Sequence, residues 1–286
     1  MTEAHSVGAM YILDNHMHLR PDGENIQAVK RFCKAGGTHL VLAHIPYKDI
    51  HITGEDSYRQ AFDRTLKMAD RVRTETSAKM FVTVGPYPVD LVHMVERMPL
   101  KGAQDVMMKG MDLAASLVED GKIIAIGEIG RPHFLVPEDI MEASNEILRY
   151  GMERAKEVGC PVVLHTESAT PGTFRELAEM AEAVGLPRYK VVKHFCPPVV
   201  RKEDNHGLFP SVIASKKNIA AAASQGTRFL METDYIDDPK RPGAVLGPAT
   251  VPKTSKYMLQ EELLTEEDLV TIHKTNPERI YGIEID

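Results

Sequence analysis

The sequence predicts a (β/α)8 barrel, the closed barrel of eight β/α units, and three observations support this. Short apolar segments of strand length alternate with longer amphipathic segments along the 286 residues. Several of the apolar segments hold almost no polar residue, which is typical of parallel strands that are buried on both faces. Such barrels commonly form one domain of about 250 residues, so we expect residues 1–286 to be a single domain.

Eight segments are predicted to be strands because they are short, mostly apolar runs between the amphipathic segments. In chain order they are Tyr11–Leu19, His39–Ile45, Met80–Val84, Ile123–Ile129, Val162–Thr166, Lys190–Phe195, Phe209–Ala214 and Phe229–Asp234.

Six segments between these strands have apolar residues at helical spacing. A glycine follows the predicted end of most of them, for example Gly36 and Gly185, as is usual at helix C-termini. The connection between the sixth and seventh strands, Val199 to Leu208, is too short for a long helix. The predicted helices are Asn25–Ala35, Ser57–Glu75, Gln104–Glu119, Glu138–Glu157, Thr173–Ala183 and Asn218–Gln225.

The alternative fold is a doubly wound open sheet, which normally places a glycine-rich phosphate loop after the first strand. Here the first strand ends in His16-Met17-His18-Leu19-Arg20, and no G-x-G-x-x-G follows, so the closed barrel is favoured. After the last strand, Asp237–Lys253 contains four prolines. We predict that this segment is an ordered loop over the barrel mouth, and that helical sequence resumes at Thr265.

Composition excludes several classes of protein. With 34 basic and 41 acidic residues the net charge is −7, and there is no long basic run, so we expect no extensive nucleic-acid binding surface. No apolar run approaches the roughly 18 residues of a membrane span. Met1–Met10 shows no secretory signal, and the three cysteines match no zinc knuckle. We therefore expect a reduced, cytoplasmic protein with no membrane partner.

Polar residues gather at the predicted C-terminal ends of the strands, where barrel enzymes carry their reactive groups. The first strand offers alternate residues, which face the same side of a strand and so point inward together. The candidates are Asp14, His16 and His18 on strand one, Glu128 on strand four, His165 with Glu167 after strand five, His194 on strand six and Asp234 on strand eight.

So many buried polar groups would each cost several kcal/mol, and a bound divalent cation would compensate for that cost. Histidine with carboxylate suits Zn, Mn, Fe, Co or Ni, whereas Mg prefers oxygen alone. Two metals fit this set, with Glu128 between them, since strand four lies midway between the first and the later strands. Asp234 would be both a ligand and the base that takes a proton from water.

Each residue taken singly also has a structural interpretation. His165 or His194 could be a buried histidine that is hydrogen-bonded to backbone, and Glu128 could belong to an ion pair that lines the barrel. Asp234 could be the N-cap of a short turn. The joint occurrence of these residues at strand ends favours the metal site.

These residues lie in motifs that resemble the TatD family of metal-dependent hydrolases, within the amidohydrolase superfamily. The matches run in the expected order over nearly the whole chain. They are Asp14-Asn15-His16-Met17-His18, Ala125-Ile126-Gly127-Glu128-Ile129-Gly130, Pro161-Val162-Val163-Leu164-His165, His194-Phe195-Cys196, Glu232-Thr233-Asp234 and the closing Asn276-Pro277-Glu278-Arg279-Ile280.

The resemblance implies a barrel hydrolase with two metals. His16, His18, Glu128 and Asp234 would hold one metal, and Glu128, His165 and His194 the other. Residues around the metal positions depart from the family pattern: the family usually has Leu-Asp where Arg131-Pro132-His133 stands here. Phe195-Cys196-Pro197-Pro198 and Tyr235-Ile236-Asp237-Asp238 differ as well.

We therefore expect a metal-dependent hydrolase that acts on a phosphodiester or phosphoester through activated water, with a deoxyribonuclease-like substrate such as a nucleic-acid end. The alternative is an amidohydrolase or lactonase for a small metabolite. A third hypothesis is a non-enzymatic metal-binding protein; the presence of Asp234, the candidate base, disfavours it.

Four further residues are candidates for binding a phosphate or carboxylate at the mouth, namely Arg131, His133, His44 and Lys193. For Arg131 and Lys193, a salt bridge at the barrel rim is an equal alternative.

Overall fold

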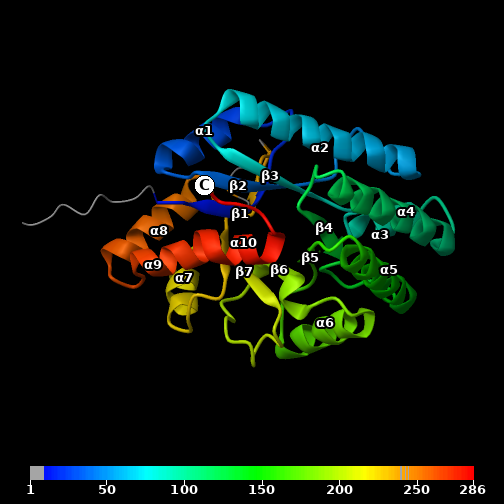
Figure 1. The fold of residues 1–286 in the computed structure, drawn as a ribbon. Coiled ribbons are helices and arrows are strands. Elements are labelled where there is room, and N and C mark those ends of the chain that lie inside the picture. The colour runs from blue at the N-terminus through cyan, green and yellow to red at the C-terminus, as the bar shows by residue number, and fades with distance from the viewer. Residues whose placement is uncertain (1–9, 239, 242, 244) are drawn as a thin grey trace, which may run out of the picture.

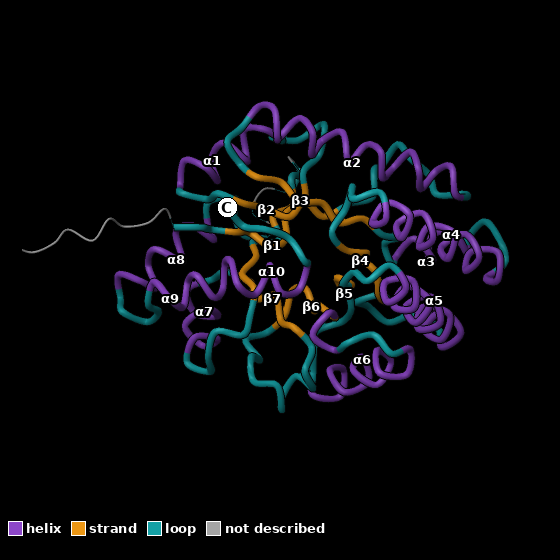
Figure 2. The backbone as a smooth tube through the Cα atoms, in the orientation of Figure 1, coloured by secondary structure: helices purple, strands orange, loops and turns teal. Residues whose placement is uncertain are grey.

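Nine parallel strand segments form one continuous sheet in the order β8-β7-β6-β5-β4-β3-β2-β1-β9. The computed structural model describes residues 10–286 apart from positions 239, 242 and 244 (Figure 1). The strands gather in the centre and the helices lie around them (Figure 2). This is the predicted (β/α)8 fold.

The strand segments are close to the predicted ones. They are β1 (Leu13–His18), β2 (His39–Ala43), β3 (Lys79–Val84), β4 (Ala125–Gly130), β5 (Val162–His165), β6 (Val191–Cys196), β7 (Phe209–Ile213), β8 (Leu230–Glu232) and β9 (Tyr235–Ile236). The helices are α1 (Ile26–Ala35), α2 (Glu55–Glu75), α3 (Val89–Val95), α4 (Leu100–Glu119), α5 (Glu138–Glu157), α6 (Pro171–Val184), α7 (Lys216–Ala223), α8 (Thr250–Gln260), α9 (Glu266–Val270) and α10 (Asn276–Tyr281), with short η1 (Arg188–Lys190) and η2 (Thr271–Thr275).

The barrel closes through two short strand segments. The predicted eighth strand, Phe229–Asp234, is observed as β8, which pairs with β7; the separate segment β9 follows the predicted end and pairs with β1, so that the two segments together close the barrel. The break lies at Thr233 and Asp234, where Asp234 has a left-handed backbone with φ of 49°. The Asp234 backbone N–H donates to the His16 carbonyl at 3.0 Å, which continues the contact with β1 across the break.

The barrel interior is apolar at the end where the strands begin. Phe209 and Leu230, the first residues of β7 and β8, pack there against Ile280 and Tyr281 of α10. A larger apolar layer lies between the sheet and the surrounding helices. The helix α10 therefore closes the N-terminal end of the barrel, and the polar ends of the strands lie at the other end.

Two features of the helical pattern differ from the prediction. The short helix α3 was not predicted, because seven residues carry too little periodicity. The segment Asp237–Lys253, predicted to be a loop, already turns helical at Thr250 rather than at Thr265. Pro252 is the third residue of α8, where its missing N–H has no helical partner to lose. Three positions of that predicted loop lie outside the described residues, and the connection between β6 and β7 has no helix in the part described.

No helix within the described ranges is both long enough and apolar enough to cross a lipid bilayer. The three cysteines are free thiols.

Candidate metal centre

Four imidazoles and two carboxylates meet at the C-terminal ends of β1, β4, β5, β6 and the β8–β9 break. Glu128 is at the centre of this group. Its Oε1 lies 2.9 Å from His194 Nε2, 3.2 Å from His165 Nδ1 and 3.5 Å from His16 Nε2. Its Oε2 lies 3.7 Å from His18 Nε2. One carboxylate thus contacts histidines from three strands.

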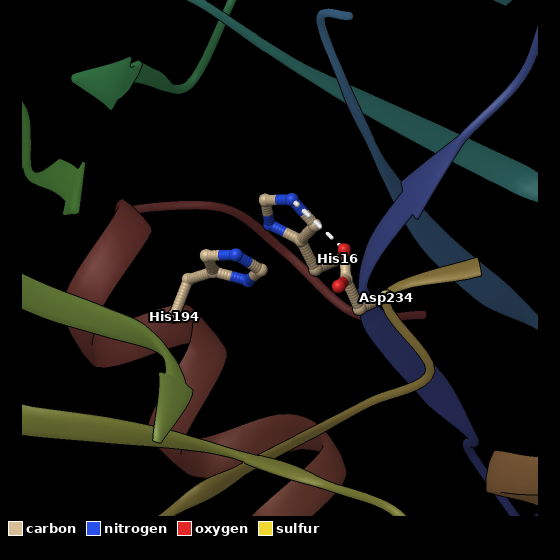
Figure 3. Close-up of side chains that lie close together, drawn as sticks. All are labelled: His16, His194 and Asp234. Carbon is tan, nitrogen blue, oxygen red and sulfur yellow. Dashed lines mark ion pairs between the residues drawn. The ribbon is translucent and has the colours of Figure 1, made fainter. Parts of the chain in front are cut away.

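Asp234 contacts the two histidines of β1 in the same group. Its Oδ1 is 3.4 Å from His18 Nε2 and 4.0 Å from His16 Nε2. Figure 3 shows the Asp234 carboxylate beside His16, with the His194 ring next to the His16 ring. Those two rings stack with centroids 4.0 Å apart.

The donor set fits a divalent cation. Three overlapping sets of ligand atoms lie within 4.8 Å of one another: His16, His18 and Glu128; Glu128, His165 and His194; and His16, His194 and Asp234. His16 Nε2 and His18 Nε2 are only 3.2 Å apart, and both face the carboxylates. Nitrogen lone pairs and carboxylate oxygens that converge in this way suit the metals that accept both donor types.

Neighbouring charges set the protonation of this cluster. Burial disfavours a charged Glu128, but His194 and His16 outweigh burial and hold the pKa of Glu128 well below its usual range. Burial likewise disfavours a charged His194, but Glu232 and Glu128 raise the pKa of His194 well above the ordinary value. For His16, burial and the charge of His194 lower the pKa well below that of a free histidine. Glu128 is therefore ionised and His16 is neutral, which are the forms that bind a cation, whereas His194 carries a proton that a bound cation would displace.

Glu232 is a functional candidate that the sequence analysis did not single out. This buried carboxylate accepts hydrogen bonds from His194 Nδ1 at 2.9 Å and from the Phe195 backbone N–H at 2.7 Å, and from the Ser211 hydroxyl. A carboxylate on the far nitrogen fixes the ring orientation and the tautomer of a metal-binding histidine. Its position two residues before Asp234 in a buried strand was the signal, because residues two apart share a face.

Asp14 faces inward, as predicted, but its carboxylate does not join the cluster. It accepts from the backbone N–H and the hydroxyl of Thr233 at 3.0 and 2.7 Å and from the His16 N–H at 3.2 Å. Burial raises the pKa of Asp14 to about 7. Asp14 therefore joins β1 to the β8–β9 break below the cluster.

Gly130 explains how β4 brings Glu128 against β5. Its φ is 147°, and a Cβ at this position would lie 2.0 Å from the His165 carbonyl oxygen. Only glycine combines this backbone with so close an approach. The same carbonyl then accepts from the Arg131 N–H at 3.0 Å.

Arg131 is turned away from the cluster and is fully paired. Its guanidinium donates to both carboxylate oxygens of Glu167 at 2.6 and 2.9 Å, to both of Glu176 at 2.9 Å, and to Asn145 Oδ1 at 3.1 Å. Every N–H is thereby used, which favours the salt-bridge interpretation over substrate binding.

The other three candidates for substrate binding lie in different surroundings. His133 Nδ1 is 2.8 Å from His165 Nε2, so His133 contacts the cluster through His165. Lys193 is buried beside the cluster, its Nζ donates to the His194 carbonyl at 2.6 Å, and burial lowers its pKa. His44 is buried behind β2, where its Nδ1 lies 2.8 Å from the Thr65 hydroxyl.

A cavity of about 240 Å³ opens directly onto the cluster. His165, His194 and Asp234 lie on its inner side, and His133, Lys193 and Phe195 form much of its wall. Phe195 is half exposed and has a left-handed backbone with φ of 49°. Strained residues of this kind are common at functional sites. The cavity gives a small molecule, or the end of a larger one, access to the cluster.

The fold and this cluster define a metal-dependent hydrolase built on a β/α barrel. The chain belongs to the family described as TatD related DNase, whose pattern it matches over residues 13–282. It is 39% identical over 278 residues to the uncharacterized protein MJ1127 of Methanocaldococcus jannaschii, covering 96% of this chain and 97% of that protein.

Two further similarities are more distant. The deoxyribonuclease TATDN3 of Homo sapiens is 25% identical over 197 residues, covering 66% of this chain and 72% of that protein. The crystal structure of YJJV, a TatD homologue from Escherichia coli, superimposes with a TM-score of 0.67 at 19% identity over 96% of this chain and all of that one.

Proposed function

We propose that this chain hydrolyses phosphodiester or phosphoester bonds, such as the bond at a nucleic-acid end, with water activated by one or two divalent cations. The observation that carries the proposal is the position of the ionised Glu128 carboxylate, which contacts four imidazoles. Membership in the TatD related DNase family and the similarity to a human deoxyribonuclease support the phosphodiester class.

The proposed ligands of one metal are His16, His18, Glu128 and Asp234, and those of the other are Glu128, His165 and His194. Two of the three convergent sets agree with this division. Zn, Mn, Fe, Co and Ni suit these donors, and Mg is also to be tested. When bound, such a cation supplies Lewis-acid activation of the water and of the ester.

The chain's own residues then perform the remaining steps. Asp234 lies at the inner end of the cavity and accepts the proton of the attacking water. Glu232 holds His194 in orientation, and His133 does the same for His165. The cavity volume of about 240 Å³ is small for a polymer, which favours the end of a strand over an internal bond.

A second candidate is an amidohydrolase or lactonase that acts on a small, partly apolar molecule. Arg131 is neutralised by two carboxylates, so it leaves no free guanidinium for a phosphate chain. The half-exposed Phe195 ring at the cavity instead offers an apolar contact.

The first test is trimming of short single-stranded DNA from its 3′ end by the wild type and by Glu128→Gln, each with Mg, Mn or Zn. Glu153→Gln, an exposed glutamate on α5, is the matched control. We expect metal-dependent trimming by the wild type and the control only, with metal content lost in Glu128→Gln. A parallel series with aryl esters and lactones tests the second candidate. Full turnover by Glu128→Gln would contradict the bridging role.

A further inference from the structure

A second cavity, of about 360 Å³, lies between residues 44–53, which follow β2, and the helix α3. We call it the β2–α3 cavity. Its apolar lining includes Ile50, Ile52, Met94 and Met98. This volume is at the lower end of the range for small-molecule sites, so the cavity suits a small ligand and not a polymer.

The rim of the β2–α3 cavity is basic. His51, His93 and Arg97 line it and are exposed. Among the residues that the structure describes, none of these three side chains forms an ion pair. Nearby cations differ in this respect, since Lys48 pairs with Asp238 and Arg64 with Asp49. The unpaired Arg97 guanidinium, together with two imidazoles that can donate hydrogen bonds, favours an anionic ligand with an apolar body.

One acidic side chain lines the β2–α3 cavity as well. Asp90 is buried in the first turn of α3 and accepts a hydrogen bond from the Tyr58 hydroxyl at 3.2 Å. Burial raises the pKa of Asp90 to about 7, so near neutral pH much of it is uncharged and able to donate a hydrogen bond to an anion.

The β2–α3 cavity is next to the metal centre in the barrel. Its lining includes His44, which directly follows Ala43 at the end of β2. The Ala43 carbonyl accepts from His18 Nδ1 at 3.0 Å, so a proposed metal ligand and the cavity wall are joined through one residue. The β2–α3 cavity and the cavity at the cluster share no lining residue, so the β2–α3 cavity is a separate site beside the metal centre.

We propose that the β2–α3 cavity binds a small amphipathic anion, a carboxylate or phosphate monoester on a short apolar body. This binding is independent of the proposed function, because the apolar lining and the basic rim are separate from the metal cluster.

The test measures binding of hexanoate, phenyl phosphate and inorganic phosphate to metal-free protein by calorimetry. The variants are His93→Gln/Arg97→Gln, which removes rim charge, and Ile52→Trp, which fills the apolar part. Arg71→Gln, an exposed arginine of α2 that pairs with Glu75, is the charge-matched control. Glu128→Gln reports any probe that binds at the cluster instead.

We expect hexanoate and phenyl phosphate to bind the wild type, the control and Glu128→Gln alike, and inorganic phosphate to bind more weakly because it has no apolar body. Binding should weaken about tenfold or more in the rim variant and disappear in Ile52→Trp.

Equal affinity in the rim variant and the wild type, loss of binding in Glu128→Gln, or no binding to the wild type would each overturn the proposal. The two proposals fail separately. If the wild type cleaves no ester but binds the probes more tightly than the rim variant does, the proposed function alone is refuted. If the wild type cleaves esters and the rim variant binds the probes as tightly as the wild type, the proposed anion site alone is refuted.

Discussion

Replacing Glu232 by glutamine tests whether the charge behind His194 supports the metal centre. In the structure, Oε1 of Glu232 accepts from both His194 Nδ1 and the Phe195 N–H, and Oε2 accepts from Ser211. Glutamine keeps the shape and one accepting oxygen, and its amide can donate to the Ser211 hydroxyl. The substitution therefore removes the negative charge with little loss of packing.

Loss of a carboxylate behind a metal-binding histidine typically costs 10–100-fold in metal affinity or activity. That factor corresponds to about 1.4–2.8 kcal/mol. We expect Glu232→Gln to fall in this range, because the charge acts on a single ligand of the set. Metal affinity is measured by competition with a chromophoric chelator, and circular dichroism checks the fold.

Ser211→Ala is the matched control, because it removes the hydrogen bond to the other oxygen of Glu232 and leaves the charge. It should change metal affinity by no more than about threefold. Unchanged metal affinity in Glu232→Gln would refute the reasoning. An equal loss in both variants would show that packing, and not charge, supports His194.

Three further predictions concern stability. Arg131→Gln should lower the free energy of unfolding by about 1–3 kcal/mol and leave KM unchanged. This loss is smaller than the loss from breaking a fully buried ion pair, because the carboxylate partners of Arg131 are partly exposed. A raised KM would show that Arg131 binds substrate. Gly130→Ala should lower the free energy of unfolding by several kcal/mol or prevent folding, because the added Cβ would collide with the His165 carbonyl. Gly226→Ala, where φ is 124° and the space around the residue is open, should lower it by only about 1–2 kcal/mol. Similar melting temperatures for the two variants would contradict this. Burial lowers the pKa of His273 from 6.5 to about 4, so on acidification the unfolded chain binds this proton before the folded chain does. The free energy of unfolding should therefore fall by about 3 kcal/mol between pH 6.5 and pH 4. An equal fall in His273→Gln would contradict this.

Much of the barrel was predictable because parallel buried strands leave a strong sequence pattern. The alternation of His16 and His18 also predicted correctly that the two rings face the same side, since strand geometry has a period of two. The same alternation placed Asp14 with them, yet its carboxylate is used by Thr233. Periodicity gives the face of a strand, whereas the depth along the barrel axis depends on the register between strands.

Other features depend on contacts that no local pattern encodes. Arg131 follows β4 in a loop and pairs with Glu176, which is 45 residues away on α6, so its neutralisation could not be derived from the motif. The resumption of the sheet as β9 after Asp234 was likewise not predicted, because two residues carry no periodic pattern. The basic rim of the β2–α3 cavity combines residues from a loop and from a helix too short to predict.

Because the last strand is interrupted, closure of the barrel and completion of the cluster depend on the same contacts between the two ends of the chain. Thr233 and Asp14, 219 residues apart in the chain, must meet before the barrel is closed, and Asp234 reaches His16 and His18 only in that same step. Long-range contacts of this kind carry a large loop-closure entropy. A nascent chain without its last strand would therefore carry an incomplete cluster, and acquisition of the full ligand set would report completion of the fold. A cation held there would join the first strand to the last and slow the reopening of the seam.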